Sequence, residues 1–115
     1  MIEDTETVVL NLKVEELKVE DLIKISEVAE KAVRRYITRR IGGRFVEDLV
    51  VTVSTRIEGS RLTITIDVSF AAPKVLGLDY EGIIDSACDE AFKAVEEVLK
   101  RYAKDSSVEV EESST

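Results

Sequence analysis

The chain has 115 residues and a formal net charge of −8, with 24 acidic residues, 16 basic residues, a single cysteine and no histidine. This length predicts one domain with a small core, and no apolar run is long enough for a membrane span. The acidic start is unlike a signal peptide, and one cysteine cannot form an internal disulfide, so we expect a cytoplasmic protein.

Two elements are expected before residue 42. Alternation from Thr7 to Val14 predicts a strand that places Val8, Leu10, Leu12 and Val14 on one face. Apolar residues then recur every three or four positions from Val19 to about Ile41, which predicts a helix with Asp21 as a candidate cap near its start. Gly42-Gly43 would end the helix, because glycine tolerates the left-handed backbone of a helix cap.

A β-hairpin is the strongest local signal in the sequence. Residues 49–58 and 61–70 alternate between apolar and polar side chains, and Gly59-Ser60 lies between them as a two-residue turn. Such a turn pairs Glu58 with Arg61, so that paired residue numbers sum to 119. The predicted inner pairs are Ile57 with Leu62, Thr55 with Ile64, Val53 with Ile66, Val51 with Val68, and Leu49 with Phe70.

A second helix is expected after the connector 71–78. Asp79 is its candidate N-cap, and its apolar stripe contains Ile84, Cys88, Ala91, Val95, Val98 and Tyr102. The predicted fold is therefore α+β, a two-layer β-α-β-β-α arrangement with a three-stranded, mainly antiparallel sheet and both helices on one face. Residues 1–104 would form this domain, and 105–115 a disordered acidic tail. The position of the first strand in the sheet stays open.

The residue types argue against catalysis. No histidine is present to act as a base, and Cys88 lies on the apolar stripe of the second helix, which favours a core role for its side chain. One cysteine without histidine leaves no zinc ligand set. Asp85, Asp89 and Glu90 are interpreted as a solvated helix face. We therefore predict no enzyme activity, no catalytic residue, no metal and no cofactor.

Residues 31–46 carry six basic side chains and no acidic one in an otherwise acidic chain. Cations near a helix C-terminus are favoured by the helix dipole and can pair with acids elsewhere. The alternative is contact with phosphate groups, for instance those of RNA, although the net charge opposes binding of nucleic acid. We call this set the basic island: Lys31, Arg34, Arg35, Arg39, Arg40 and Arg44.

Two features suggest an interface. The predicted outer face of the hairpin is rich in short hydroxyls, which suits either an exposed sheet or a face that a second copy covers. The connector is unusually apolar for a loop. The candidate interface residues are Thr52, Ser54, Thr63, Thr65, Val75, Leu76 and Leu78.

The sequence also resembles a family of short, uncharacterised archaeal proteins over about residues 18–103. The likeness rests on general patterns: Glu20-Asp21-Leu22-Ile23, Ala29-Glu30-Lys31-Ala32, Tyr36-Ile37, Val46-Glu47-Asp48-Leu49 with Val51 and Val53, and the segment Ala91–Leu99. It implies an archaeal, cytosolic source and supplies no catalytic residue. The element order is similar to that of the small dimerising subunit of the KEOPS tRNA-modification complex, a likeness of architecture only.

These observations favour a non-catalytic binding or assembly module that acts as a homodimer or as a small subunit of a larger complex. Its partner would be a second copy or another protein, and no membrane is involved. The alternative is an RNA-associated protein that uses the basic island.

Overall fold

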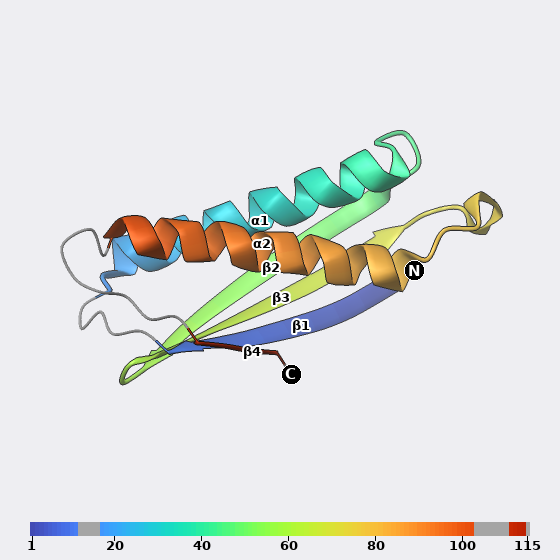
Figure 1. The fold of residues 1–115 in the computed structure, drawn as a ribbon. Helices are drawn as coiled ribbons and strands as arrows, with labels where there is room; N and C mark the ends of the chain where they lie inside the picture. The colour runs from blue at the N-terminus through green and yellow to red at the C-terminus, as the bar shows by residue number, and fades with distance from the viewer. Residues whose placement is uncertain (12–16, 103–110, 115) are drawn as a thin grey trace.

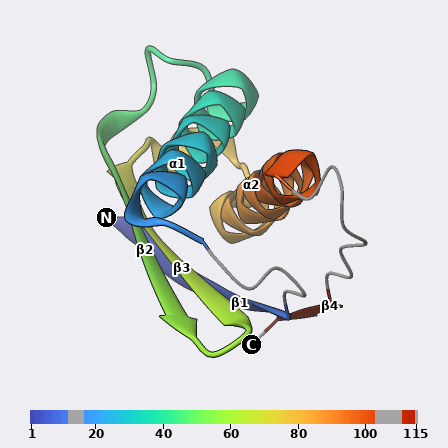
Figure 2. The same cartoon turned by 90° about the vertical axis from the view of Figure 1, so that its left-hand side faces the viewer.

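The computed structural model describes residues 1–11, 17–102 and 111–114. Within them the fold has two layers, with an antiparallel sheet on one side and two helices lying side by side on the other (Figures 1 and 2). This confirms the predicted α+β class. The elements in chain order are β1 (Ile2–Asn11), α1 (Val19–Ile41), β2 (Glu47–Glu58), β3 (Arg61–Ala71), the short 3₁₀ helix η1 (Lys74–Leu76), α2 (Tyr80–Tyr102) and β4 (Glu111–Ser114).

The β2–β3 hairpin has the predicted register over most of its length. Partner numbers sum to 119 from the Val50–Ser69 pair to the Glu58–Arg61 pair at the turn. The pairing predicted for Leu49 with Phe70 is wrong, because the register shifts between Glu47 and Val50. Asp48 lies in this bulge with a φ of 54°, a left-handed conformation that aspartate tolerates better than most residues.

β1 pairs antiparallel with β3, from Ile2 opposite Phe70 to Asn11 opposite Arg61. The strand order is β2-β3-β1-β4, so β3 is the central strand of the three long ones. β1 begins at Ile2, five residues before the predicted start at Thr7. The strand positions predicted for residues 12 and 14 lie outside the described residues.

The C-terminal segment differs in part from the expected disordered tail. Residues Glu111–Ser114 form β4, which pairs antiparallel with the second half of β1, from Val8 to Asn11. The composition of this segment predicts no order by itself, but an open strand edge supplies main-chain partners regardless of side-chain type. The other tail residues lie outside the described part of the chain.

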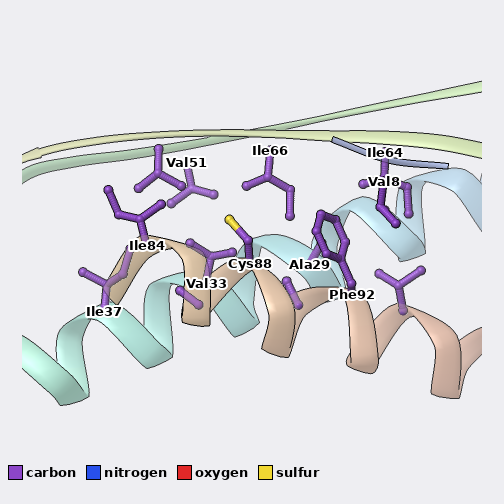
Figure 3. Close-up of a cluster of buried hydrophobic side chains, with 14 of the residues drawn as sticks. Val8, Ala29, Val33, Ile37, Val51, Ile64, Ile66, Ile84, Cys88 and Phe92 are labelled. Atoms are coloured by element: carbon purple, nitrogen blue, oxygen red, sulfur yellow. The ribbon is translucent and has the colours of Figure 1, made fainter. Parts of the chain in front are cut away.

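The core lies between the two layers (Figure 3). Each fully buried aliphatic side chain contributes about 1.5–3 kcal/mol of burial free energy. The buried residues of α1 are Ile25, Ala29, Val33, Ile37 and Ile41. Three other residues of this helix pack at the margin of the core: Leu22, Ala32 and Tyr36. The buried residues of the sheet are Val8, Leu10, Val51, Leu62, Ile64, Ile66, Val68 and Phe70.

The helix ends follow local capping rules. Asp79 is the N-cap of α2, as predicted, because its carboxylate accepts a hydrogen bond of 3.1 Å from the Gly82 N–H. Asp21 is not the N-cap of α1 but its third residue, and its carboxylate accepts the Lys18 N–H at 2.8 Å. Gly42 ends α1 with a φ of 101°, which favours glycine, and its N–H donates to the Thr38 carbonyl.

Candidate interaction surface

The sheet face opposite the helices is uncovered in the described part of the chain (Figure 2). Thr52 and Ser54 are exposed on this face, whereas Thr63 and Thr65 are half-buried within the sheet. The hydroxyl pattern continues onto β1, where the Thr7 and Thr65 hydroxyl oxygens are 3.3 Å apart. The predicted hydroxyl-rich face is therefore present, and it spans three strands.

β2 forms one edge of the sheet, and no strand among residues 1–11, 17–102 and 111–114 pairs with its outer side. A groove of about 360 Å³ runs between this edge and α1. Large apolar side chains beside the groove are exposed to solvent: Val19 is 71% exposed and Ile23 54%. Val53 and Thr55 line the floor of the groove on the β2 side. The edge therefore lies beside a mixed margin, in which exposed apolar side chains of α1 stand next to Glu27 and Glu30.

The apolar residues of the connector 71–78 differ in their exposure to solvent. Leu76 packs against the core from η1, whereas Val75 is 89% exposed and Leu78 is also exposed. Figure 1 shows this segment projecting beyond the ends of the helices and the sheet. Of the predicted apolar patch, only two residues are therefore free to contact a partner.

The basic island contains one residue with a structural role and five that are exposed. Arg34 is structural, because its Nε donates to the Glu30 carboxylate at 3.0 Å and its Nη1 donates to the Leu49 carbonyl at 3.2 Å, joining α1 to β2. The other five members are exposed and form no ion pair within residues 17–102. Arg35 and Arg39 line a hollow of about 260 Å³ between the helices, with Glu90 on its other side.

An acidic cluster joins β1 to α2. One carboxylate oxygen from each of Asp4, Glu6 and Asp85 lies within 4.8 Å of the other two. A hydrogen bond to Asp85, together with burial and the neighbouring negative charges, raises the pKa of Glu6 to about 7. Three carboxylate oxygens are hard donors that suit Mg²⁺ or Ca²⁺, but a shared proton relieves the same repulsion.

This cluster was not predicted, because the strand predicted from Thr7 leaves out Asp4 and Glu6. The signal was present in the alternation, since Asp4 and Glu6 have the same parity as the buried Val8 and Leu10. Asp85 was assigned to a solvated helix face, and it is exposed, yet it borders the carboxylates of β1. Only the pairing of β1 with β3 brings these residues together.

Cys88 is a core residue, as predicted. It is 1% exposed, and Figure 3 shows its thiol pointing from α2 toward the sheet, near Ile66. Burial raises the pKa of this thiol to about 12, and the negative charge of Glu6 and its neighbours acts in the same direction. The thiol therefore stays protonated at neutral pH and is a poor nucleophile.

A family model described as "Protein of unknown function (DUF3194)" matches residues 14–98. The chain belongs to this family. Similar proteins include the uncharacterized proteins PF0383 of Pyrococcus furiosus, 30% identical over 84% of this chain and 86% of that protein, and TK0644 of Thermococcus kodakarensis, 31% identical over 84% and 89%. These relatives are archaeal, in agreement with the predicted resemblance.

Solved structures support the fold assignment. A crystal structure from Thermococcus onnurineus NA1 is 26% identical, has a TM-score of 0.70, and matches 90% of this chain and 98% of that one. A de novo designed protein with a ferredoxin fold, LFR1 1, has a TM-score of 0.52 at 14% identity, over 97% and 85% of the two chains, and so shows the fold alone. These matches give no support to the likeness with the KEOPS subunit.

None of the helices within the described residues has the length and apolar character needed to cross a membrane.

Proposed function

We propose that this protein is a cytoplasmic, non-catalytic assembly module that acts as a homodimer or as a small subunit of a larger complex. The observation that carries the proposal is the edge of the sheet at β2, whose outer side pairs with no strand among residues 1–11, 17–102 and 111–114 and lies beside exposed apolar side chains. Unpaired strand edges bind other strands readily, and proteins that stay monomeric usually protect them. A surface of this kind is suited to protein contact and supplies no chemistry of its own.

The titratable groups support a non-catalytic role. The Cys88 thiol is buried and protonated, so it offers no nucleophile at neutral pH. The carboxylates of the acidic cluster lie close enough together to restrict each other's ionisation, although Asp4 also lines a hollow of about 200 Å³. Neither group has the nucleophile–base pairing on which covalent catalysis depends.

The decisive experiment is the solution mass. We expect light scattering during size exclusion to give the mass of two chains at micromolar concentration, with dissociation on dilution. Homodimers of small domains usually bury well over 1,000 Å² in total, which sustains association in this range. A mass of one chain at all concentrations, together with no co-purifying protein partner, would contradict the proposal.

A second candidate function rests on the basic island. Lys31, Arg35, Arg39, Arg40 and Arg44 have no carboxylate partner within residues 17–102, although the chain is acidic overall. Such free cations attract polyanions such as RNA, with an affinity that falls steeply with salt. Replacement of Arg35, Arg39 and Arg40 by Gln should then flatten the salt dependence by about one log-log unit for each phosphate that these arginines neutralise in the wild type.

The matched control for RNA binding is Arg61→Gln, which removes an exposed cation at the distant hairpin turn. If the basic island binds RNA, the triple variant loses retention and the control keeps it. Equal binding by both variants would exclude a role for the basic island. Weak binding by the wild type at physiological salt would leave assembly as the only function proposed.

A further inference from the structure

We infer that two copies of this chain join through β2, antiparallel and about a two-fold axis near Thr52, so that two sheets become one continuous sheet. This inference rests on the proposed assembly role and specifies its interface. It differs from the candidate set derived from the sequence, because the contact is the edge of the sheet and the groove beside it. The outer sheet face and the connector are not required.

The two edges of the sheet are protected to different degrees. On the β1 side, β4 pairs with the second half of the strand, and the first half carries Asp4 and Glu6 on its helix-facing side. Inward-pointing charges and covered segments are known devices against edge-to-edge pairing. β2 has neither device between Leu49 and Thr55, where it carries no charged residue and no proline. The free edge is therefore the one that remains competent to add a strand.

Charge complementarity selects a second copy in the antiparallel orientation. β2 is acidic at its start, Glu47 and Asp48, and near its end carries Arg56, which forms an ion pair with Glu58 of the same strand. A two-fold axis at Thr52 places the acidic end of each strand alongside Arg56 of the other copy, twice by symmetry. Parallel addition would set the acidic ends side by side. Moving the axis by one residue to Val53 would bring Asp48 level with Glu58, a like-charge pair that is unfavourable.

The same register matches the apolar side chains. On the helix-facing side it sets Val51 beside Val53 of the other copy, and these β-branched residues suit cross-strand packing. Val53 is only partly buried in one copy and lines the groove under α1, so the added strand would complete its burial. Exposed Val19 and Ile23 at the margin of the groove would then face the second copy.

A cross-linking experiment tests the register. With the axis at Thr52, the two copies place this residue opposite itself with Cβ atoms about 4.5–5.5 Å apart. Thr52→Cys should therefore form a covalent dimer in high yield with a short thiol cross-linker. The native Cys88 is buried and should not react. Thr65→Cys, on the same sheet face but on the central strand β3, is the matched control and should stay monomeric in denaturing gels.

Two outcomes would overturn the inference. Cross-linking of Thr65→Cys as efficiently as Thr52→Cys would place the contact on the sheet face. Stronger cross-linking at Ser54→Cys than at Thr52→Cys would displace the axis and reject the register. In both cases the proposed assembly role would stand.

A second pair of variants tests the edge without cysteine chemistry. Thr55→Lys places a charge on the open edge beside the groove, a natural device against strand addition, and should convert the dimer to a monomer. Thr65→Lys, which faces Thr7 and Ser54 in neighbouring strands, should keep the dimer mass. Circular dichroism verifies that both variants are folded.

The two hypotheses fail in different ways. A monomeric wild type with no co-purifying protein partner would refute both the assembly role and the interface. A monomeric wild type that co-purifies with another protein would refute the interface alone. A wild-type dimer that persists in folded Thr55→Lys would refute the β2 interface alone.

Discussion

The two edges of this sheet differ in how well they are protected against pairing with another strand. The β1 edge is partly covered by β4 and carries carboxylates that point toward α2. The β2 edge carries short and β-branched residues, and α1 stands back from it far enough to leave a groove. The β1 edge disfavours an added strand through charge and cover, whereas the β2 edge offers both main-chain and apolar contacts. Substitutions at each edge and at the sheet centre can test this difference.

The largest expected effect is a loss of unfolding free energy, which should be greater for a substitution at the sheet centre than for one at the open edge. Ile66 on β3 is fully buried, whereas its partner Val53 on β2 is only partly buried. Ile66→Asp should lower the free energy of unfolding by several kcal/mol, because it buries an unpaired carboxylate. In a single copy Val53→Asp should be clearly milder, since the charge can reach water through the groove, so the two variants are compared at concentrations where the chain is monomeric. Urea unfolding of both variants provides the measurement, and equal losses would show that the β2 edge is as closed as the centre.

The stability of the protein should depend on pH through Glu6 at the β1 edge. The folded-state pKa of Glu6 is raised to about 7 from an ordinary value of 4.5, so the folded protein favours the protonated carboxyl. This stabilisation is fully present below pH 4.5 and is lost as the pH rises through 7. Glu6→Gln should therefore gain stability relative to the wild type between pH 5 and pH 8, by roughly 1 kcal/mol once solvent screening is allowed for.

The control for that comparison is Glu3→Gln, an exposed carboxylate of the same strand. Thermal unfolding of the wild type and both variants across this pH range supplies the data. A difference between Glu6→Gln and the wild type that does not change with pH would contradict the shared proton between Glu6 and Asp85.

A smaller effect is expected where α1 holds the bulged end of β2. Arg34→Gln removes the hydrogen bond to the Leu49 carbonyl and the pair with Glu30, and should lower stability by about 1 kcal/mol. Arg35→Gln, one residue away and without a partner in residues 17–102, should change stability by less than about 0.5 kcal/mol. Similar losses in urea unfolding would indicate that Arg34 does not join the layers.

The smallest effect is expected in the connector. Val75→Glu should leave both stability and solution mass unchanged, because the side chain is 89% exposed and belongs to η1, in the segment that projects beyond the end of the sheet (Figure 1). Leu76→Glu should destabilise slightly, since this residue packs against the core. Light scattering and thermal unfolding distinguish the two. Loss of the dimer in Val75→Glu would show that the connector, and not β2, forms the interface.

Local sequence signals predicted much of the fold. The hairpin register followed from the two-residue turn at Gly59-Ser60, because a side-chain period of two allows little freedom once one pair is set. The prediction failed at Leu49, where a bulge at Asp48 adds a residue that alternation does not reveal. The helix limits were predicted well at Gly42 and Asp79, because caps depend on residues within one turn.

The candidate site was predicted less well. The hydroxyl-rich outer face and the exposure of Val75 follow from residue type and alternation. The division of the basic island did not, because only the packing of α1 on β2 brings Arg34 to the Leu49 carbonyl. The acidic cluster was not predicted for the same reason, since Asp85 is about eighty residues from Asp4 and Glu6 along the chain.

The order of elements, the hairpin and the apolar stripe of each helix follow from local signals, because they depend on periodicity and on turn and cap residues within a few positions. The pairing of β1 with β3, and not with β2, depends instead on long-range packing. Alternation shows which face of a strand is buried but not which neighbour it takes, because all strands offer the same main-chain groups. That choice left the outer side of β2 unpaired within the described residues and brought Glu6 close to Asp85.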